Sequence, residues 1–135
     1  MVIDTSAILA ILFEEKESQT FAALIANDAV RLMAAPTLTE CLIVLEAKKG
    51  SAATRELELL LHKTSMDIVA FTAEQAMLAH MAWQHYGKGR HPAALNLGDC
   101  FSYALAKHTG EPLLFKGLDF DKTDVLSVGY YRPDP

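Results

Sequence analysis

The sequence predicts an α/β domain built around a largely parallel β-sheet. The chain has 135 residues, of which 51% are hydrophobic and 21% charged, a balance that suits one globular domain, residues 1–135, with its own core. Short apolar segments of strand length alternate along the chain with longer stretches of helical periodicity. Helices between consecutive strands are typical of parallel strand pairing. We find no internal repeat that would suggest another architecture.

The predicted strands are short apolar segments, and the first of them ends directly in an acid, Asp4. The second strand is closed by Pro36. The strands are predicted at residues 1–3, 30–34, 66–71, 113–115 and 125–128. Helices are predicted between them, at residues 7–13, 17–27, 37–49, 51–63, 72–86 and 98–109.

Local signals support several of these helix boundaries. Thr37 followed by Glu40 predicts a capping box, and Thr72 followed by Gln75 repeats that signature. Glycines close the helices of residues 37–49 and 98–109. The interior of the first of these two helices is apolar all round, which favours burial on more than one side, with a second subunit as one candidate.

Composition excludes several classes of protein. With 17 acidic and 12 basic residues the formal net charge is −5, so the chain cannot hold nucleic acid by bulk charge and needs a local basic patch or bound cations to handle phosphates. No apolar run is long enough to span a bilayer, and no charged segment precedes an apolar one at the start. We therefore expect a cytoplasmic protein with no membrane association.

Cysteine and aromatic residues are expected to serve the core. Two cysteines, Cys41 and Cys100, cannot form a disulfide scaffold or a four-ligand zinc site, and both read as small buried residues. Trp83, Phe101 and Tyr103 occur within predicted helices, where aromatic side chains usually pack inward.

Four acids fall where a parallel sheet binds its ligands, near the carboxyl ends of predicted strands. Asp4 ends the first strand, and Glu40 lies in the first turn of the helix after the second. Asp99 begins the last predicted helix, and Asp119 follows the fourth strand. Converging carboxylates would repel one another unless a cation lay between them, and hard divalent ions prefer oxygen ligands. The pattern therefore indicates a site for Mg²⁺ or Mn²⁺.

Each acid also has a purely structural interpretation. Asp4 and Asp99 suit the start of a helix. Glu40 fits the capping box with Thr37, and Asp119 suits a turn. Only the fold can decide between the two interpretations, because the four acids come from separate segments.

Other catalytic motifs are missing from the sequence. It has neither a Gly-x-Ser-x-Gly elbow nor a phosphate-binding loop that ends in Gly-Lys-Ser/Thr. The concentrated basic loop contains Lys88, Arg90 and His91, which either bind phosphate groups or form a solvated loop. Lys116 lies close to Asp119 and is a candidate for contact with a phosphate or for an ion pair with that acid.

The segments around the four acids resemble those of a known family. Residues 4–7 (DTSA) resemble the opening motif of PIN domains, and residues 35–40 (APTLTE) resemble their second acidic motif. Residues 95–106 (LNLGDCFSYALA) are similar to the third motif and residues 113–120 (LLFKGLDF) to the fourth. The chain length, the order of the motifs and the nearly complete coverage are similar to those of VapC-type ribonuclease toxins of type II toxin–antitoxin systems.

This resemblance implies a three-layer α/β/α sandwich with a mostly parallel central sheet. It also implies a homodimer that cleaves RNA as an endonuclease with Mg²⁺ or Mn²⁺, and a cognate VapB-like antitoxin protein that covers the acidic site. In such a mechanism the metal lowers the pKa of a bound water and neutralises charge that develops on the phosphate.

The resemblance also implies roles for particular residues. Catalytic and metal-binding roles pass by motif to four acids, Asp4, Glu40, Asp99 and Asp119. Ser6 resembles the family's hydroxyl that hydrogen-bonds the acidic cluster. Asp121 and Asp124 follow Asp119 closely, so the identity of the fourth ligand stays open. RNA contacts are expected from Lys88, Arg90 and Lys116.

Two further interpretations stand beside this one. A metal-dependent phosphatase could form an aspartyl-phosphate at Asp4, but the usual Asp-x-Asp-x-Thr/Ser pattern is broken by Ser6 and Ile8. A non-catalytic module could keep the fold and use its surface only to bind a partner. DNA is an alternative substrate, since no sequence feature recognises a 2′-hydroxyl.

Overall fold

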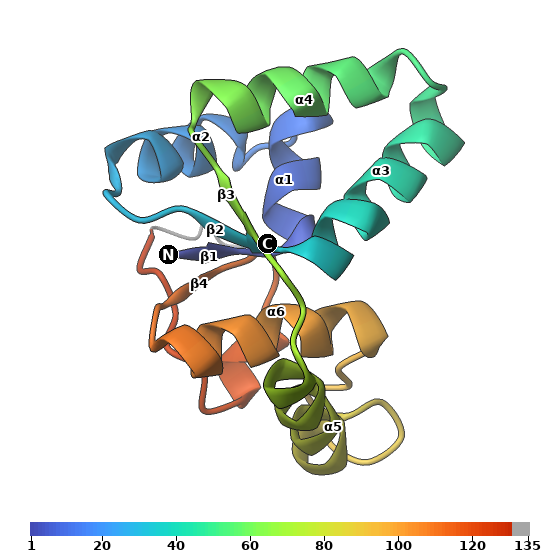
Figure 1. Cartoon of the computed structure of the whole chain (residues 1–135), viewed down its shortest axis with the longest axis vertical. Helices are drawn as coiled ribbons and strands as arrows, with labels where there is room; N and C mark the ends of the chain where they lie inside the picture. The colour runs from blue at the N-terminus through green and yellow to red at the C-terminus, as the bar shows by residue number, and fades with distance from the viewer. Residues whose placement is uncertain (131–135) are drawn as a thin grey trace.

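A computed structural model describes residues 1–130, and within them four short strands form one parallel sheet in the order β3-β2-β1-β4 (Figure 1). The strands are Val2–Ile3 (β1), Leu32–Ala34 (β2), Asp67–Val69 (β3) and Leu113–Leu114 (β4). The helices are Thr5–Leu12 (α1), Ser18–Asn27 (α2), Ala35–Lys49 (α3), Ala53–Lys63 (α4), Ala73–Tyr86 (α5) and Leu97–Thr109 (α6), and a 3₁₀ turn follows at Phe120–Lys122 (η1).

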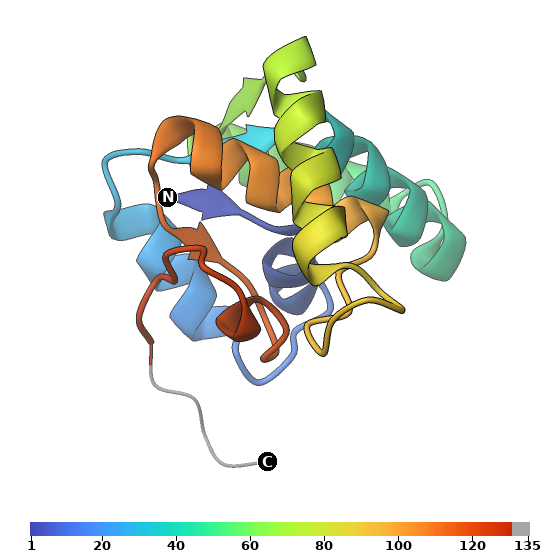
Figure 2. The ribbon, with the colours of Figure 1, turned by 90° about the horizontal axis from the view of Figure 1, so that it is seen from below.

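Helices cover both faces of the sheet, as the three-layer prediction requires. Successive side chains of a strand point to opposite faces, so Val2 and Leu113 pack in the core with α5 and α6, whereas Ile3 and Leu114 pack in the core with α1 to α4. Figures 1 and 2 show these two helical layers on either side of the strands. The α/β/α sandwich predicted from the sequence is confirmed.

Strand β1 carries the first acid into the centre of the molecule. It lies between β2 and β4, and its residues Val2 and Ile3 are fully buried. The pairing continues past the strand, because the backbone N–H of Asp4 donates to the carbonyl of Leu114 at 3.0 Å. Asp4 is therefore fixed at the carboxyl edge of the sheet.

Two expectations about secondary structure are wrong. The predicted strand at residues 125–128 is reduced to an isolated bridge between Leu113 and Ser127. The capping box of Thr37 with Glu40 does not form, because α3 begins at Ala35, with Pro36 in its first turn. Thr37 is buried inside the helix instead.

The other local signals mostly act as predicted. Thr72 caps α5 and accepts a hydrogen bond from the backbone of Gln75 at 3.2 Å. Gly110 ends α6 with a φ of +74°, a left-handed conformation that glycine adopts without strain. No helix in the described part of the chain is both long and apolar enough to cross a bilayer.

Core predictions hold for the cysteines and fail for the tryptophan. Cys41 and Cys100 are buried free thiols, as expected. Tyr103 is buried and Phe101 half-buried. Trp83, which we expected in the core, is 42% exposed, because it lies at one end of an open groove between α5 and α6, where Arg90 covers one face of its ring.

Candidate active site

The helices α3 and α6 both begin at the carboxyl edge of the sheet, next to the end of β1. Each helix presents an acid and a hydroxyl three residues apart, which places both groups on one side of the helix. On α3 the pair is Thr37 and Glu40, and on α6 it is Asp99 and Ser102. The sides of α3 and α6 that carry these residues come together next to Asp4, and the candidate site lies there.

Asp4 is a buried carboxylate whose two oxygens are both held. It caps α1 by accepting a hydrogen bond from the backbone N–H of Ser6 at 3.0 Å. The hydroxyl of Ser6 donates to the same oxygen, Oδ2, at 2.7 Å, and the hydroxyl of Ser102 donates to Oδ1 at 2.6 Å. The capping interpretation and the site interpretation of Asp4 are thus compatible. The expected hydrogen bond from Ser6 to the acidic cluster is present.

Glu40 lies in the second turn of α3, not in the first as expected, and its carboxylate reaches toward α6. Thr5 donates its hydroxyl proton to Glu40 Oε1 at 2.5 Å. The carboxylate lies so close to Gly98 that a Cβ atom there would stand 2.4 Å from Glu40 Oε2. Because Gly98 has no side chain, the carboxylate of Glu40 can occupy the space beside it.

Asp99 forms a capping box with Asn96 at the start of α6. Its backbone N–H donates to Asn96 Oδ1 at 2.9 Å, and its own Oδ2 accepts from the backbone of Asn96 at 3.0 Å. Burial raises the pKa of Asp99 to about 6, and the negative charges of Asp4, Glu40 and Asp119 add to the increase.

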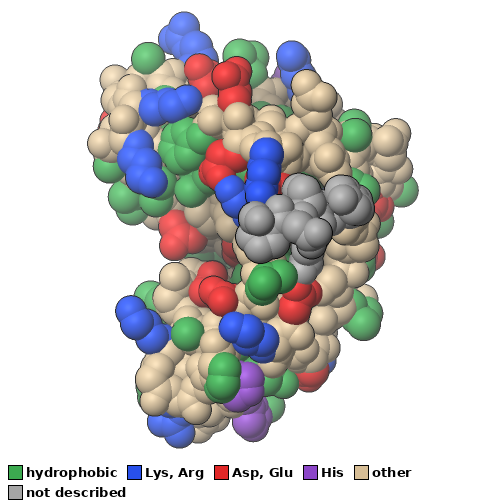
Figure 3. All heavy atoms as spheres, turned by 180° about the vertical axis from the view of Figure 1, so that it is seen from behind, with side chains coloured by type: hydrophobic (Ala, Val, Ile, Leu, Met, Phe, Trp, Pro, Cys, Tyr) green, Lys and Arg blue, Asp and Glu red, His purple; other side chains and the backbone are tan. Residues whose placement is uncertain are grey.

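The four predicted acids therefore lie within electrostatic reach of one another, although they come from distant segments. In Figure 3 acidic side chains surround a recess between the two helical layers. Repulsion of this kind is what a bound cation would relieve.

The two thiols near the site are not candidate ligands. Burial raises the pKa of the Cys41 thiol to about 12, with further contributions from the charges of Asp4 and Glu40. Burial likewise raises the pKa of Cys100 to about 11. Burial thus favours the protonated form of both thiols, whereas a metal binds the thiolate. The carboxylate oxygens that remain at this site are the donors that Mg²⁺ and Mn²⁺ prefer.

The acids after β4 differ in their surroundings. The charge of Asp119 lies close enough to Asp99 to contribute to its raised pKa. The carboxylate of Asp124 accepts hydrogen bonds from the hydroxyl of Tyr103 at 2.5 Å and from Lys107 at 3.1 Å. Asp121 is exposed and accepts a weak bond from Ser127 at 3.4 Å. These contacts favour Asp119 as the fourth acid.

Among the residues that the structure describes, Lys116 pairs neither with Asp119 nor with a free site for phosphate, but with two glutamates before α2. Its backbone N–H donates to the hydroxyl of Ser6 at 3.0 Å, and its ammonium group contacts Glu15 and lies 3.4 Å from Glu17 Oε2. No ion pair between Lys116 and Asp119 occurs among the described residues. A contact of Lys116 with phosphate would first require its pair with the acids of the α1–α2 connection to open.

Replacing Lys116 by Met is expected to lower the free energy of unfolding by about 1–2 kcal/mol, because Glu17 would stay buried without a counter-ion. Urea denaturation measures this change. The exposed Lys63→Met serves as the control. A stability equal to that of the wild type would show that the ion pair contributes nothing to the fold.

The basic loop is placed beside the acidic site by its own pairing. Gly87 and Leu95 form a parallel bridge that closes the loop directly before Asn96. Lys88 extends from this loop, whereas Arg90 folds back over Trp83, with its guanidinium carbon 4.6 Å from the ring centroid. Of the two, Lys88 is therefore the freer to meet a phosphate.

The donor set at this edge fits a hard divalent cation. Within residues 1–130, no three His, Cys, Asp or Glu side chains already stand as a formed metal site. The carboxylates of Asp4, Glu40 and Asp99 each accept hydrogen bonds through oxygens that keep further lone pairs. Oxygen donors with surplus negative charge are the chemistry that Mg²⁺ and Mn²⁺ require.

Sequence reasoning missed the polar partners of the acids. Thr5, Thr37 and Ser102 all hydrogen-bond within the site, and only Ser6 was expected to do so. A signal was present in Ser102, a polar residue within an otherwise apolar helix segment and on the same side of that helix as Asp99.

A parallel α/β/α sandwich with acids gathered at the carboxyl edge of its sheet defines the PIN class of domains, and sequence comparison agrees. The PIN domain family profile matches residues 1–126. The chain is 51% identical to ribonuclease VapC30 of Mycobacterium tuberculosis over 128 residues, which cover 95% of this chain and 98% of that protein. It is 52% identical to a ribonuclease VapC of Mycolicibacterium smegmatis, with 95% and 99% covered. The chain therefore belongs to the PIN domain family, in its VapC group.

Solved structures of low sequence identity share the same fold. The VapC20 toxin of Mycobacterium tuberculosis, which cleaves the sarcin–ricin loop, superposes with a TM-score of 0.75 at 20% identity, covering 94% of this chain and 97% of that one. A toxin–antitoxin complex from Klebsiella pneumoniae gives 0.69 at 18% identity, with 96% and 97% covered. VapBC2 of Rickettsia felis, bound to a DNA fragment from its promoter, gives 0.73 at 16% identity, with 97% and 98% covered.

Proposed function

We propose that this chain is a divalent-metal-dependent endoribonuclease, that residues 1–135 act as a single nuclease domain, and that it is the toxin of a type II toxin–antitoxin pair. The observation that carries the proposal is the gathering of Asp4, Glu40 and Asp119 around Asp99, whose pKa is raised to about 6 by burial and, in addition, by their charges. Support comes from relatives near 50% identity that are named VapC ribonucleases.

We assign the metal-binding and catalytic roles to the four converging acids, Asp4, Glu40, Asp99 and Asp119. Bound Mg²⁺ or Mn²⁺ would neutralise the phosphate and activate a water for hydrolysis of the phosphodiester. The chain itself orients the ligands: Ser6 holds Asp4, Thr5 holds Glu40, and Asn96 holds Asp99. Such partners of metal ligands typically tune affinity by about 10–100-fold.

The direct test is cleavage mapping on total cellular RNA with purified protein freed of any antitoxin. We expect internal cleavage with Mn²⁺ or Mg²⁺, none after chelation, and none by Asp4→Asn. Matched DNA oligonucleotides distinguish a DNase, and a phosphorylated Asp4 after incubation with a phosphate ester would identify an aspartyl-phosphate enzyme. Metal-loaded protein that leaves every nucleic acid and phosphate ester intact would support a non-catalytic binding module instead.

Substrate contacts are proposed for the basic loop. We expect the double substitution Lys88→Glu with Arg90→Glu to raise the Kd for RNA by about tenfold and to flatten its salt dependence, because phosphate contacts release counter-ions. Fluorescence anisotropy with a labelled RNA at several salt concentrations measures both effects. Lys63→Glu, at the end of α4, is the control. An unchanged salt slope in the double variant would make the loop a solvated one.

An antitoxin partner is inferred from the toxin–antitoxin complexes among the similar structures. We propose a VapB-like protein that covers the acidic recess, and an RNA target that places the pair in the cytoplasm. Its segment at the site must be basic or must hydrogen-bond carboxylates, since it faces the charges of Asp4, Glu40 and Asp99. Expression of the chain with its neighbouring gene should yield a complex that does not cleave RNA.

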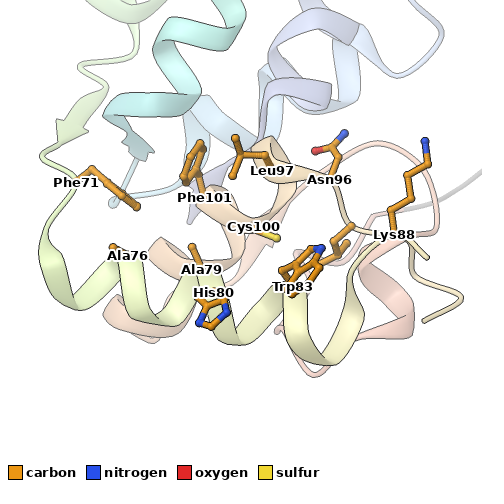
Figure 4. Close-up of a pocket in the computed structure, with 11 residues that line it drawn as sticks. Phe71, Ala76, Ala79, His80, Trp83, Lys88, Asn96, Leu97, Cys100 and Phe101 are labelled. Atoms are coloured by element: carbon orange, nitrogen blue, oxygen red, sulfur yellow. The ribbon is translucent and has the colours of Figure 1, made fainter. Parts of the chain in front are cut away.

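A homodimer is the second assembly we propose, and an exposed apolar face supports it. Two adjoining grooves, one between α5 and α6 and one between α3 and α6, share Phe71, Leu97 and Phe101. Figure 4 shows the first groove, with Trp83 at one end and Phe71 at the other. Ile43 lines the second groove and is 63% exposed, and Leu97 lines both grooves and is 71% exposed. A continuous apolar surface of this kind typically marks a protein interface.

Replacing Leu97 by Glu is expected to weaken the dimer by about 100-fold, because a charge would be buried in an apolar contact. Light scattering after size-exclusion chromatography measures the change in mass. Leu59→Glu, on the distant helix α4, introduces the same charge at a residue of 55% exposure and should leave the dimer intact. Equal masses for the two variants would place the interface elsewhere.

A further inference from the structure

A chain of buried hydroxyl groups reaches Asp4 from behind the acidic recess. Ser102 of α6 is 1% exposed and donates to Asp4 Oδ1 at 2.6 Å. Thr37 of α3 is also 1% exposed, and its Oγ1 lies 3.4 Å from Ser102 Oγ. Hydroxyls buried this deeply in a core are uncommon unless their hydrogen bonds are needed.

The direction of these hydrogen bonds follows from the number of protons. An ionised carboxylate only accepts, so the single hydroxyl proton of Ser102 goes to Asp4. Ser102 can then only accept from its other neighbour, which makes Thr37 the donor between them. The chain runs from Thr37 through Ser102 to Asp4, with a weak first bond at 3.4 Å that polarises the strong second bond at 2.6 Å only slightly.

Ser6 and Ser102 hold different oxygens of the same carboxylate. Both bonds from Ser6 reach Oδ2, so among residues 1–130 Ser102 supplies the one hydrogen bond to Oδ1. The terminal torsion of an aspartate has a broad energy minimum, and one held oxygen leaves the group free to pivot. Two held oxygens fix the plane of the carboxylate, and hence the direction of its remaining lone pairs.

We propose that Ser102 is a positioning residue, which sets the Asp4 carboxylate for divalent-metal binding with Thr37 as the donor behind it. The proposal rests on the metal-dependent function proposed above. Asp99 and Ser102 lie on the same side of α6, so one helix supplies an acid of the cluster and also orients the acid that ends β1. A purely structural Ser102 would serve only the packing of α6 against β1.

Direct Mn²⁺ binding to RNA-free protein separates the two roles. By electron paramagnetic resonance of free Mn²⁺, we expect Ser102→Ala to bind about tenfold more weakly than the wild type, as partners of metal ligands typically do. Ser102→Thr restores a hydroxyl and should recover part of the affinity. In cleavage assays the Mn²⁺ concentration for half-maximal rate should rise in parallel, while KM for RNA at saturating Mn²⁺ stays unchanged.

Controls keep each outcome decisive. Ser18→Ala removes a hydroxyl from α2 that bonds only the carbonyl of Ile11, and it should leave Mn²⁺ affinity unchanged. If Ser102→Ala does not fold, Thr37→Val removes the donor behind Ser102 and should weaken binding by about threefold. Wild-type affinity in the folded variant would overturn the role of Ser102. Wild-type protein that binds Mn²⁺ but cleaves no RNA would overturn the nuclease proposal alone.

Discussion

Replacing Asp99 by Asn is expected to lower RNA cleavage by about 100-fold or more and, at the same time, to raise the melting temperature of the metal-free protein at pH 7. The loss follows from the removal of a carboxylate ligand, without which the metal is held by fewer charges. The gain follows from the removal of a charge that burial and its neighbours disfavour. The amide of Asn can still accept the capping hydrogen bond from the backbone of residue 96.

The pH dependence of this gain has a definite sign. The pKa of Asp99 rises from its usual value of 3.8 to about 6 in the folded protein, so the folded state binds this proton more tightly than the unfolded chain does. The stability that this proton contributes is complete below pH 3.8 and is lost as the pH rises through about 6. At pH 7 the variant should therefore be more stable by about 1–2 kcal/mol, after allowance for solvent screening, and the difference should vanish near pH 4.

Thermal melts with and without Mn²⁺ at several pH values test both halves of this expectation. Mn²⁺ should raise the melting temperature of the wild type and leave Asp99→Asn nearly unaffected, because ligands stabilise only the state that binds them. Asp67→Asn, at an exposed position on β3, is the control and should match the wild type throughout. A variant that melts lower than the wild type at pH 7 would show that the charge of Asp99 is already compensated.

The positions of the acids were predictable because each depends on a local rule. Asp4 follows an apolar segment and Asp99 begins a helix, and the carboxyl ends of parallel strands share one edge of the sheet. Helix α3 began two residues earlier than expected because Pro36 suits the first turn of a helix as well as the end of a strand. That shift moved Glu40 into the second turn without changing the edge to which it belongs.

The partners of the acids were not predictable by such rules. Ser102 is 98 residues from Asp4 and 65 from Thr37, so only the packing of α6 against β1 and α3 brings them together. The exposure of Trp83 escaped prediction for a related reason. Helical periodicity shows which residues share a face, but which face stays uncovered depends on the neighbouring helices and on subunits outside the chain.

Gly98 offers a second way to disable the site without removing any charge. We expect Gly98→Ala to reduce both Mn²⁺ affinity and RNA cleavage by about tenfold or more, because its Cβ would stand 2.4 Å from Glu40 Oε2 and 2.7 Å from Oε1. The carboxylate is the flexible end of its side chain and can move away, so the clash displaces a ligand but leaves the backbone in place. Alanine is also the better helix former, although at the second position of α6 its advantage is smaller than the value of about 1 kcal/mol for a helix interior.

The fold of Gly98→Ala should thus be at least as stable as that of the wild type while its site is impaired, which thermal melts and Mn²⁺ titration can show side by side. Gly129→Ala adds the same methyl group where nothing lies within 4 Å, and it should change neither property. If Gly98→Ala cleaved RNA at the wild-type rate, Glu40 would not need the position that it holds against α6. Asp4 and Asp99 would then have to support metal binding and RNA cleavage without a fixed position for the Glu40 carboxylate.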